Sequence, residues 1–515
     1  MRNSYFWTIA LLLSLYLCIF SFQKINFLTA DIGRHIKNGE IFLNSNAFGI
    51  PKSDVLHTNL FSYTYQKFPF INHHWGSGIA MYLIFLASGF SGLSIAYWFC
   101  IILAFIFALL VAKDEANLFD IFITGLFLTP LVADRTEIRP ESISYLLISV
   151  FIYILFQFSK NRIPWKWLLL IPLLEALWSN MHIYFIFGPF LVGVFLFETL
   201  VKRNFFMAKK LGIILALTFF ATLITPYGLS GAVYPFTIFQ NYGYRIVENQ
   251  SIPFLENLSF INPSFLWYKV TLGLIVLSSA LTLIRKRKDF PISLTIISLT
   301  FAVLAYFGIR HMTAFALVSL PLLAINFSVI QKSLSKWLNR EITWFLYGII
   351  SFLILVSTFT HFSNKLPWNR NFGLGVVNGS FDSINFIKNN DIHGPFFNNY
   401  DIGGAMIFSF FPQKKVFVDN RPETYPAEFF NNVYIPTQES NVAWQKTDMQ
   451  YHFNAIYFYR LDMTPWAQNF LLQKIDDKAW APVYVDDQSI IFLKRNEENK
   501  KIIENLELPR SMFGS

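Results

Sequence analysis

The chain has 515 residues, of which 54% are hydrophobic and only 14% are charged, and its net charge is +9. This composition excludes an ordinary soluble domain and is typical of a membrane protein with many spans. The positive charge lies mostly in short stretches between apolar runs, a pattern of membrane topology and not of a nucleic-acid-binding surface. Cys18 and Cys100 lie inside hydrophobic runs, so we expect no structural disulfide.

Apolar runs that approach the length of a bilayer span recur along the first 360 residues. We expect about eleven transmembrane helices, at 5–22, 91–112, 118–133, 142–159, 167–180, 183–201, 210–225, 265–284, 290–308, 312–328 and 342–360. The first run follows Arg2 and has no small-residue cleavage site, which favours a retained helix over a signal peptide.

Basic clusters between the runs predict which side of the membrane each loop occupies. Those at 160–166, 202–210, 285–288 and 332–340 are expected to be cytoplasmic. Alternation then predicts a multi-pass protein of the cell's inner (plasma) membrane, with a cytoplasmic N-terminus and an extracytoplasmic segment after residue 360. To satisfy parity, 76–88 should lie along the outer membrane surface while only 91–112 crosses, with the break at Ser88-Gly89-Phe90-Ser91-Gly92.

The polar segment 23–75 carries the richest chemistry in the sequence. Asp31 follows the first apolar run closely, and Arg34 and His35 come after it at helical spacing. A charged group at the membrane surface in this pattern indicates a site, and a loop this long is more often functional than a simple connection. The alternatives are a structured cap, or a role for Asp31 as the N-cap of a helix that begins near Ile32. The same segment also carries His57, His73 and His74.

Other loops predicted to be outside carry further candidate residues, namely Arg135, Glu137, Arg139, Glu141, His182, Arg310 and His311. Charged residues at membrane depth are costly unless they are paired or line a polar cavity, so they mark candidate sites. Each has a structural alternative. Arg310 could anchor a helix end at the interface, His182 could be a hydrogen-bonding turn residue, and 134–141 could be a solvated turn.

The remainder, 363–515, is predicted to be a small extracytoplasmic α/β domain, distinct from a transmembrane domain over 1–362 that includes the long first outer loop 23–90. Strands are expected at 394–398, 416–418, 455–458, 482–485 and 490–493, and helices at 381–389, 401–410 and 464–473. Asp486-Asp487-Gln488 reads as a hairpin turn between the last two strands. The turn at 419–422 is expected either to help bind an acceptor or to be purely structural.

Several motifs resemble the GT-C superfamily of integral-membrane glycosyltransferases, in particular an uncharacterised bacterial branch. They are Asp31-Ile-Gly-Arg-His35, Phe70-Ile-Asn-His-His-Trp75, Leu177-Trp-Ser-Asn-Met-His182, Thr225-Pro-Tyr-Gly228, Arg310-His-Met-Thr-Ala-Phe315, Asn399-Tyr-Asp-Ile-Gly-Gly404 and Val416-Phe-Val-Asp-Asn-Arg421. The chain departs from the pattern at His74, where a glutamate is expected, and at Thr225, where an asparagine is usual. The first departure removes a possible acid.

The resemblance implies that a sugar moves from a polyprenyl-phosphate-linked donor to a glycan, lipid or protein acceptor on the outer face. It implies Asp31 as the base, and Arg135, Arg139 and Arg310 as ligands of the donor phosphate. Substrate contacts are expected from Arg34, His35, His73, His74, Glu137, Glu141, His182 and His311. A divalent metal such as Mg²⁺ or Mn²⁺ is possible and is left unassigned. The alternative is a non-catalytic or transport component, such as a flippase for lipid-linked sugars or an assembly partner.

Overall fold

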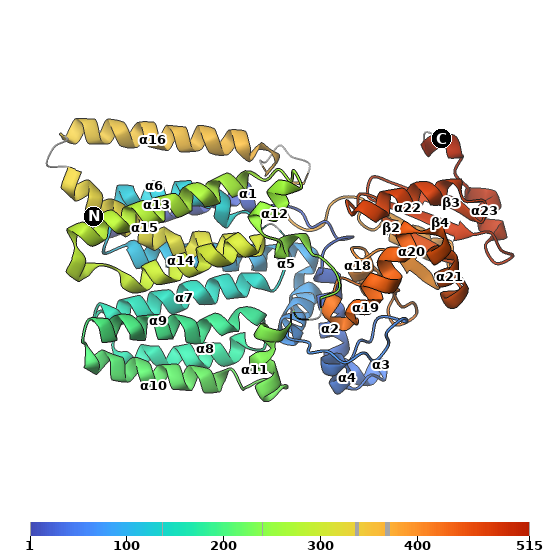
Figure 1. The fold of residues 1–515 in the computed structure, drawn as a ribbon, viewed down its shortest axis with the longest axis horizontal. Coiled ribbons are helices and arrows are strands. Elements are labelled where there is room, and N and C mark those ends of the chain that lie inside the picture. Colours follow the sequence, from blue (N-terminus) through green and yellow to red (C-terminus); the bar gives the residue numbers. More distant parts are fainter. Residues whose placement is uncertain are drawn as a thin grey trace. The chain divides into compact units, whose positions relative to one another are not determined.

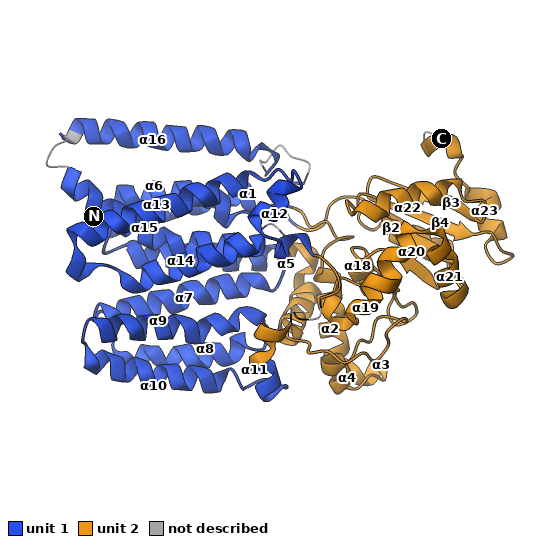
Figure 2. Cartoon of the chain, in the orientation of Figure 1, with its two compact units in different colours: residues 1–23, 94–232, 246–374 blue, residues 24–93, 233–245, 375–515 orange. Residues whose placement is uncertain are grey.

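The computed structural model describes residues 2–135, 137–238, 240, 242–334, 339–365 and 371–513, with Arg340 described by its backbone only. Its contacts divide the chain into two compact units (Figure 2). The first comprises 1–23, 94–232 and 246–374, and the second comprises 24–93, 233–245 and 375–515. The sequence grouped the first loop with the membrane part, whereas packing places 24–93 in the same unit as the C-terminal residues.

The first unit is a bundle of apolar helices (Figure 1). Its helices are α1 (Arg2–Ser21), α6 (Leu118–Val132), α7 (Glu141–Ser159), α8 (Leu170–Trp178), α9 (Phe187–Val201), α10 (Phe205–Ala221), α12 (Ile252–Asn257), α13 (Pro263–Arg285), α14 (Ile292–Phe307), α15 (Met312–Leu334) and α16 (Arg340–His361). α15 packs against α6, α13 and α14 and is buried along most of its length, so it forms the core of the bundle.

Every apolar run expected from the sequence is helical in the described part of the chain. Seven described helices are long and apolar enough to cross a membrane, and the shorter helices 118–132 and 292–307 are also apolar. The chain is therefore a multi-pass membrane protein, while the number eleven stays a prediction. Cys18 and Cys100 are free, as expected.

Two helices, α5 (Trp75–Ala112) and α11 (Gly228–Thr237), contribute residues to both units. α5 is interrupted at Gly89, whose φ of 62° lies in the left-handed region that favours glycine. The interruption falls inside the break expected at 88–92. That 76–88 lies along the membrane surface stays a prediction.

The second unit combines short helices with a small sheet. Its helices are α2 (Ile32–Leu43), α3 (Ser45–Phe48), α4 (Lys52–His57), α17 (Asp382–Asn389), α18 (Gly403–Phe410), α19 (Ala427–Phe429), α20 (Ile435–Glu439), α21 (Asn441–Tyr451), α22 (Pro465–Asp476) and α23 (Lys500–Leu506). The sheet has the order β1-β2-β4-β3, with β1 (Phe396–Asn398), β2 (Ala455–Tyr459), β3 (Trp480–Val485) and β4 (Ser489–Lys494). β1 pairs with β2 in parallel, and the other pairs are antiparallel.

The β3–β4 hairpin forms where the sequence predicted it. The Asp486 carboxylate accepts hydrogen bonds from the backbone N–H groups of Gln488 and Ser489, both at 2.7 Å, which closes the turn. The prediction of a strand at 416–418 is wrong. This segment joins no strand of the described sheet, because Val416 instead forms an isolated bridge with Ser62 of the first loop.

Candidate active site

The three arginines predicted to bind phosphate meet in one ion-pair cluster of the first unit. Arg135 and Arg139 lie in the α6–α7 connection, and Arg310 lies in a 3₁₀ turn just before α15. Arg135 pairs with Glu141 at 3.1 Å, and Arg310 pairs with the same carboxylate oxygen at 3.3 Å. Glu248 pairs with both Arg135 and Arg139. Residues up to 175 positions apart in sequence therefore form one cluster, which we call the arginine cluster.

Strong electrostatic coupling holds the arginine cluster together. Its arginines are only 12–18% exposed, and Glu141 and Glu248 are 3% and 14% exposed. Burial would raise the pKa of Glu248, but Arg135, Arg139 and Arg310 outweigh burial and lower it to about 2. Three buried arginines thus face two buried carboxylates, which leaves an excess positive charge. The third acid, Glu137, pairs with Arg139 at 2.7 Å but is half exposed.

Two N–H donors of the arginine cluster remain available to a ligand. The Nε atoms of Arg135 and Arg310 are buried and find no hydrogen-bond acceptor among the described residues. A buried donor without an acceptor costs free energy, so an anionic oxygen that reached it would be bound favourably. Arg310 also donates to the Asn249 side chain at 3.0 Å.

The sequence indicates Glu248 only as a charged residue of a predicted outer loop at 226–264, without a role in the site, and it does not indicate Asn249. Both lie in a 3₁₀ turn at 247–249 inside a long connection, and nothing in their local spacing indicates a pairing with arginines more than 60 or 100 residues away. Charge balance was the only available signal, because buried arginines need carboxylate partners.

Beside the arginine cluster, His182 and His311 form hydrogen bonds inside the bundle. Trp178 Nε1 donates to Ser144 Oγ at 2.8 Å, and Ser144 Oγ is hydrogen-bonded to His182 Nδ1, also at 2.8 Å. His182 is 1% exposed and caps the following 3₁₀ turn. This is the role of a hydrogen-bonding turn residue, the structural alternative given above. His311 Nδ1 contacts the Tyr184 hydroxyl at 2.8 Å. That either histidine touches a substrate stays a prediction.

Asp31 and Arg34 lie in the second unit, at the start of α2. Arg34 is 3.7 Å from the Asp31 carboxylate, and its Nε donates to the Asn420 side chain at 3.1 Å. Helix α2 begins at Ile32, as the capping alternative required, but the Asp31 side chain makes no capping hydrogen bond and its backbone is already helical. The capping explanation for Asp31 is therefore wrong.

The predicted histidines of the first loop form a continuous row of rings. The centroids of His35 and His74 are 5.2 Å apart, those of His74 and His73 are 3.8 Å apart, and His73 meets Tyr234 at 5.3 Å. The row therefore runs from α2, next to Asp31 and Arg34, to the segment 233–245.

Glycines permit the close packing that positions α2. A Cβ added to Gly33 would lie 2.7 Å from the backbone oxygen of Gly404 in α18, closer than real Cβ atoms approach. Any larger residue at position 33 would push α2 away from α18 and would displace Asp31 and Arg34. The motifs at 31–35 and 399–404 thus meet at this contact.

The turn at 419–422 has the structural role that the sequence left open. Arg421 is 2% exposed and binds both oxygens of Asp419 at 2.8 Å, and it also donates to the Asn59 side chain at 3.0 Å. Such a bidentate buried pair ties the C-terminal part of the unit to the first loop. That the turn also helps to bind an acceptor stays a prediction.

The described residues do not assemble a metal site. No three His, Cys, Asp or Glu side chains in that part of the chain lie close enough together to hold an ion. Glu141 is also occupied by Arg135, Arg310 and the Tyr145 hydroxyl. A role for Mg²⁺ or Mn²⁺ stays a prediction.

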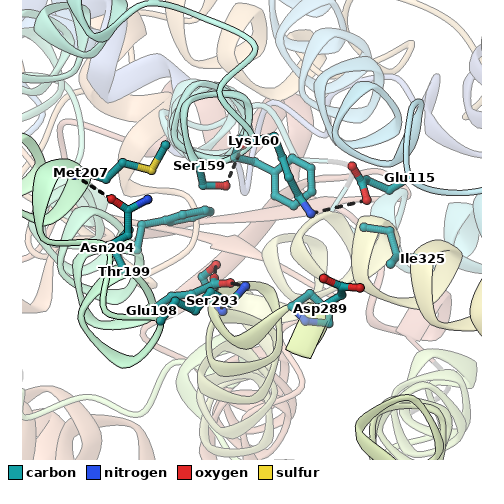
Figure 3. Close-up of a pocket in the computed structure, with 14 residues that line it drawn as sticks. Glu115, Ser159, Lys160, Glu198, Thr199, Asn204, Met207, Asp289, Ser293 and Ile325 are labelled. Atoms are coloured by element: carbon teal, nitrogen blue, oxygen red, sulfur yellow. Dashed lines mark hydrogen bonds and ion pairs between the residues drawn. The ribbon is translucent and has the colours of Figure 1, made fainter. Parts of the chain in front are cut away.

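A cavity of about 110 Å³ lies at the C-terminal end of α7, whereas the arginine cluster lies at its N-terminal end (Figure 3). It is lined by Glu115, Lys160, Lys202 and Asp289. Lys160 and Lys202 belong to loops predicted to be cytoplasmic, and Asp289 directly follows a third such loop. Because α7 has 19 residues, about 28 Å separates its two ends. Loops predicted to share a side thus gather at one end of the unit, and the arginine cluster lies at the other. Which end faces the cytoplasm stays a prediction.

No family model matches the sequence, and no curated protein matches it. Solved structures do. The oligosaccharyltransferase AglB of Archaeoglobus fulgidus, in complex with an inhibitory peptide and a dolichol-phosphate, superposes with a TM-score of 0.62 at 11% identity, over 93% of this chain and 72% of that chain.

Two other structures of the A. fulgidus oligosaccharyltransferase agree with this match. The form tethered to an acceptor peptide with an NVT sequon has a TM-score of 0.56 at 11% identity, over 96% of this chain and 74% of that chain. The complex with Zn and sulfate has a TM-score of 0.58 at 12% identity, over 95% of this chain and 72% of that chain. This chain therefore has the fold of these oligosaccharyltransferases, the GT-C fold of integral-membrane glycosyltransferases that its motifs predicted.

Proposed function

We propose that the chain is a membrane glycosyltransferase that moves a sugar from a polyprenyl-phosphate-linked donor to an acceptor on the outer face of the membrane. The arginine cluster is the observation that carries the proposal. Arginine is suited to bind phosphate because its planar fork matches two phosphate oxygens at once. The fold adds support, since a similar structure holds a dolichol-phosphate.

In the proposed reaction, Arg135, Arg139 and Arg310 bind the donor phosphate. The phosphate competes with Glu141 and Glu248 for the guanidinium groups and reaches the unused Nε donors of Arg135 and Arg310. The leaving polyprenyl phosphate carries more negative charge than the donor, so the cluster stabilises the transition state more than the ground state.

Asp31 is the proposed base. Its carboxylate makes no capping bond, so α2 does not need it for its start. The neighbouring Arg34 guanidinium, 3.7 Å away, orients the carboxylate in this proposal. Arg34, His35, His73 and His74 are proposed as substrate contacts, and Glu137, His182 and His311 are proposed to complete the donor side.

The test is sugar transfer by the purified protein in lipid nanodiscs, with a panel of radiolabelled polyprenyl-phosphate hexoses. Label should leave the lipid fraction with wild-type protein and not with Arg310→Ala. Arg162→Ala is the matched control, because Arg162 pairs with Glu115 at the other end of α7. Equal turnover by Arg310→Ala and wild type would refute the donor site, and a flippase would move the lipid without cleaving it.

A further inference from the structure

The second unit contains a large cavity that none of the roles above uses. Its volume is about 670 Å³, within the range of small-molecule sites. Besides His57 at the end of α4, three segments line it, which are the first loop at 68–71, the residues 234, 237, 238 and 240, and the residues 423 and 425–428. All three belong to the same compact unit.

Aromatic rings and carboxylates dominate the lining of this cavity. Phe68, Phe70, Tyr234 and Tyr425 supply rings, and Glu423 and Glu428 supply carboxylates. No lysine or arginine is among the described residues that line it. A ligand must therefore offer apolar faces and hydrogen-bond donors, and it must be neutral or cationic.

The first-loop wall is rigidly held. Asn59 N donates to Phe68 O at 2.9 Å, and a bridge between Thr58 and Pro69 extends this pairing. Behind the wall, the Arg421 guanidinium lies 5.2 Å from the centre of the Phe70 ring. The buried Arg421–Asp419 pair thus fixes the position of an aromatic side chain that lines the cavity, which gives that pair a positioning role.

Glu423, one of the two carboxylates that line the cavity, interacts with the same arginine as the proposed base Asp31. Glu423 is half-buried, and the Tyr242 hydroxyl donates to it at 3.4 Å. The charges of Asp31 and Glu423 both act on the Arg34 guanidinium. At the far wall, Tyr234 continues the row of rings that runs through His73 and His74 to α2.

We propose that this cavity binds the acceptor and that the acceptor is a neutral or amino-sugar glycan; this rests on the proposed glycosyltransferase function. The axial C–H faces of pyranose rings pack on aromatic side chains, and their hydroxyl and ammonium groups donate to carboxylates.

The transfer then balances as follows. An acceptor hydroxyl oxygen forms a bond to the anomeric carbon of the donor sugar, and the bond from that carbon to the phosphate oxygen breaks. Polyprenyl phosphate leaves with the bonding electrons, and the hydroxyl proton passes to the Asp31 carboxylate. The donor is the polyprenyl-phosphate sugar of the proposed function, and no other reactant is required.

Binding of defined disaccharides to the full-length protein in nanodiscs tests the proposal, by saturation-transfer NMR and calorimetry. The probes are the glucosamine disaccharide, its N-acetylated form and a sulfated lactose. The cationic and neutral probes should bind, and the sulfated probe should bind at least about tenfold more weakly, a difference of ~1.4 kcal/mol. Equal binding of all three, or of none, would overturn the assignment.

Variants locate the binding. Tyr234→Leu should weaken the N-acetylated probe about tenfold while Tyr234→Phe preserves its affinity, because stacking needs only the ring. Glu428→Gln, at an exposed position, should reduce the preference for the cationic probe. Glu439→Gln is the control, an exposed acid of α20 that does not line the cavity. Loss of binding in Glu439→Gln as well would refute the location.

The two proposals fail separately. Saccharide binding that depends on Tyr234, without any cleavage of polyprenyl-phosphate sugars, would refute the glycosyltransferase function and leave the glycan site standing. Transfer of sugar to peptides, with no saccharide binding, would refute the glycan site and leave the glycosyltransferase function.

Discussion

Glu248 is the residue whose replacement tests the arginine cluster most directly. Glu248→Gln keeps the shape but removes a carboxylate that is 14% exposed and shared by Arg135 and Arg139. The pKa of Glu248 is lowered from 4.5 to about 2, and this shift corresponds to about 3 kcal/mol of stability at neutral pH. We expect Glu248→Gln to lose about that amount, as breaking a buried ion pair does.

The pH dependence has a definite sign. A carboxyl whose pKa is lower in the folded protein stabilises it above the unfolded pKa and loses that contribution as the pH falls through the folded value. Wild-type protein should therefore lose this stability between about pH 4.5 and 2. The Glu248→Gln variant lacks the group and should show a flatter dependence in that window.

The same variant should respond more strongly to a phosphate lipid. Without Glu248, Arg135 and Arg139 have one competitor fewer, so undecaprenyl phosphate should raise the unfolding temperature more in Glu248→Gln than in wild type. The assay is thermal unfolding in detergent, with and without this lipid. Glu256→Gln is the control, because Glu256 of the same connection forms an exposed pair with Lys269 of α13 and its loss should cost at most ~1 kcal/mol. A stable Glu248→Gln variant, or a smaller lipid response, would refute the reasoning.

Four further results are expected. Asp31→Asn should lower sugar transfer by at least about 10²-fold without changing the unfolding temperature, since the carboxylate makes no cap; full activity would refute its role as base. Arg139→Lys should weaken donor use in a binding assay although charge is kept, because Arg139 bridges Glu137 and Glu248 with separate nitrogens; a lysine variant equal to wild type would show that only charge matters. Chelation by EDTA should abolish transfer if Mg²⁺ or Mn²⁺ is required, and adding either ion back should restore it. Cysteines near positions 46 and 441 should be labelled from outside and one near 286 only after permeabilisation, whereas inside labelling at 441 would invert the topology.

The sequence by itself predicted most of the local structure. Hydropathy located the apolar helices. A segment in lipid must form its backbone hydrogen bonds within itself, so it is a helix whose consecutive side chains are mostly apolar. Alternating apolar residues and the Asp486 turn located the β3–β4 hairpin for the same local reason. The charged loops also named most members of the arginine cluster, because buried charge at membrane depth is costly.

The tertiary structure alone decided the partners. Glu248 joins Arg135 and Arg139 across more than 100 residues, and Val416 pairs with Ser62 instead of entering the sheet. It also showed that the Asp31 side chain does not cap α2. Local periodicity carries no information about such contacts, because they depend on which helix faces and loops pack together. Their free energy comes from charges and backbones brought close only in the folded chain.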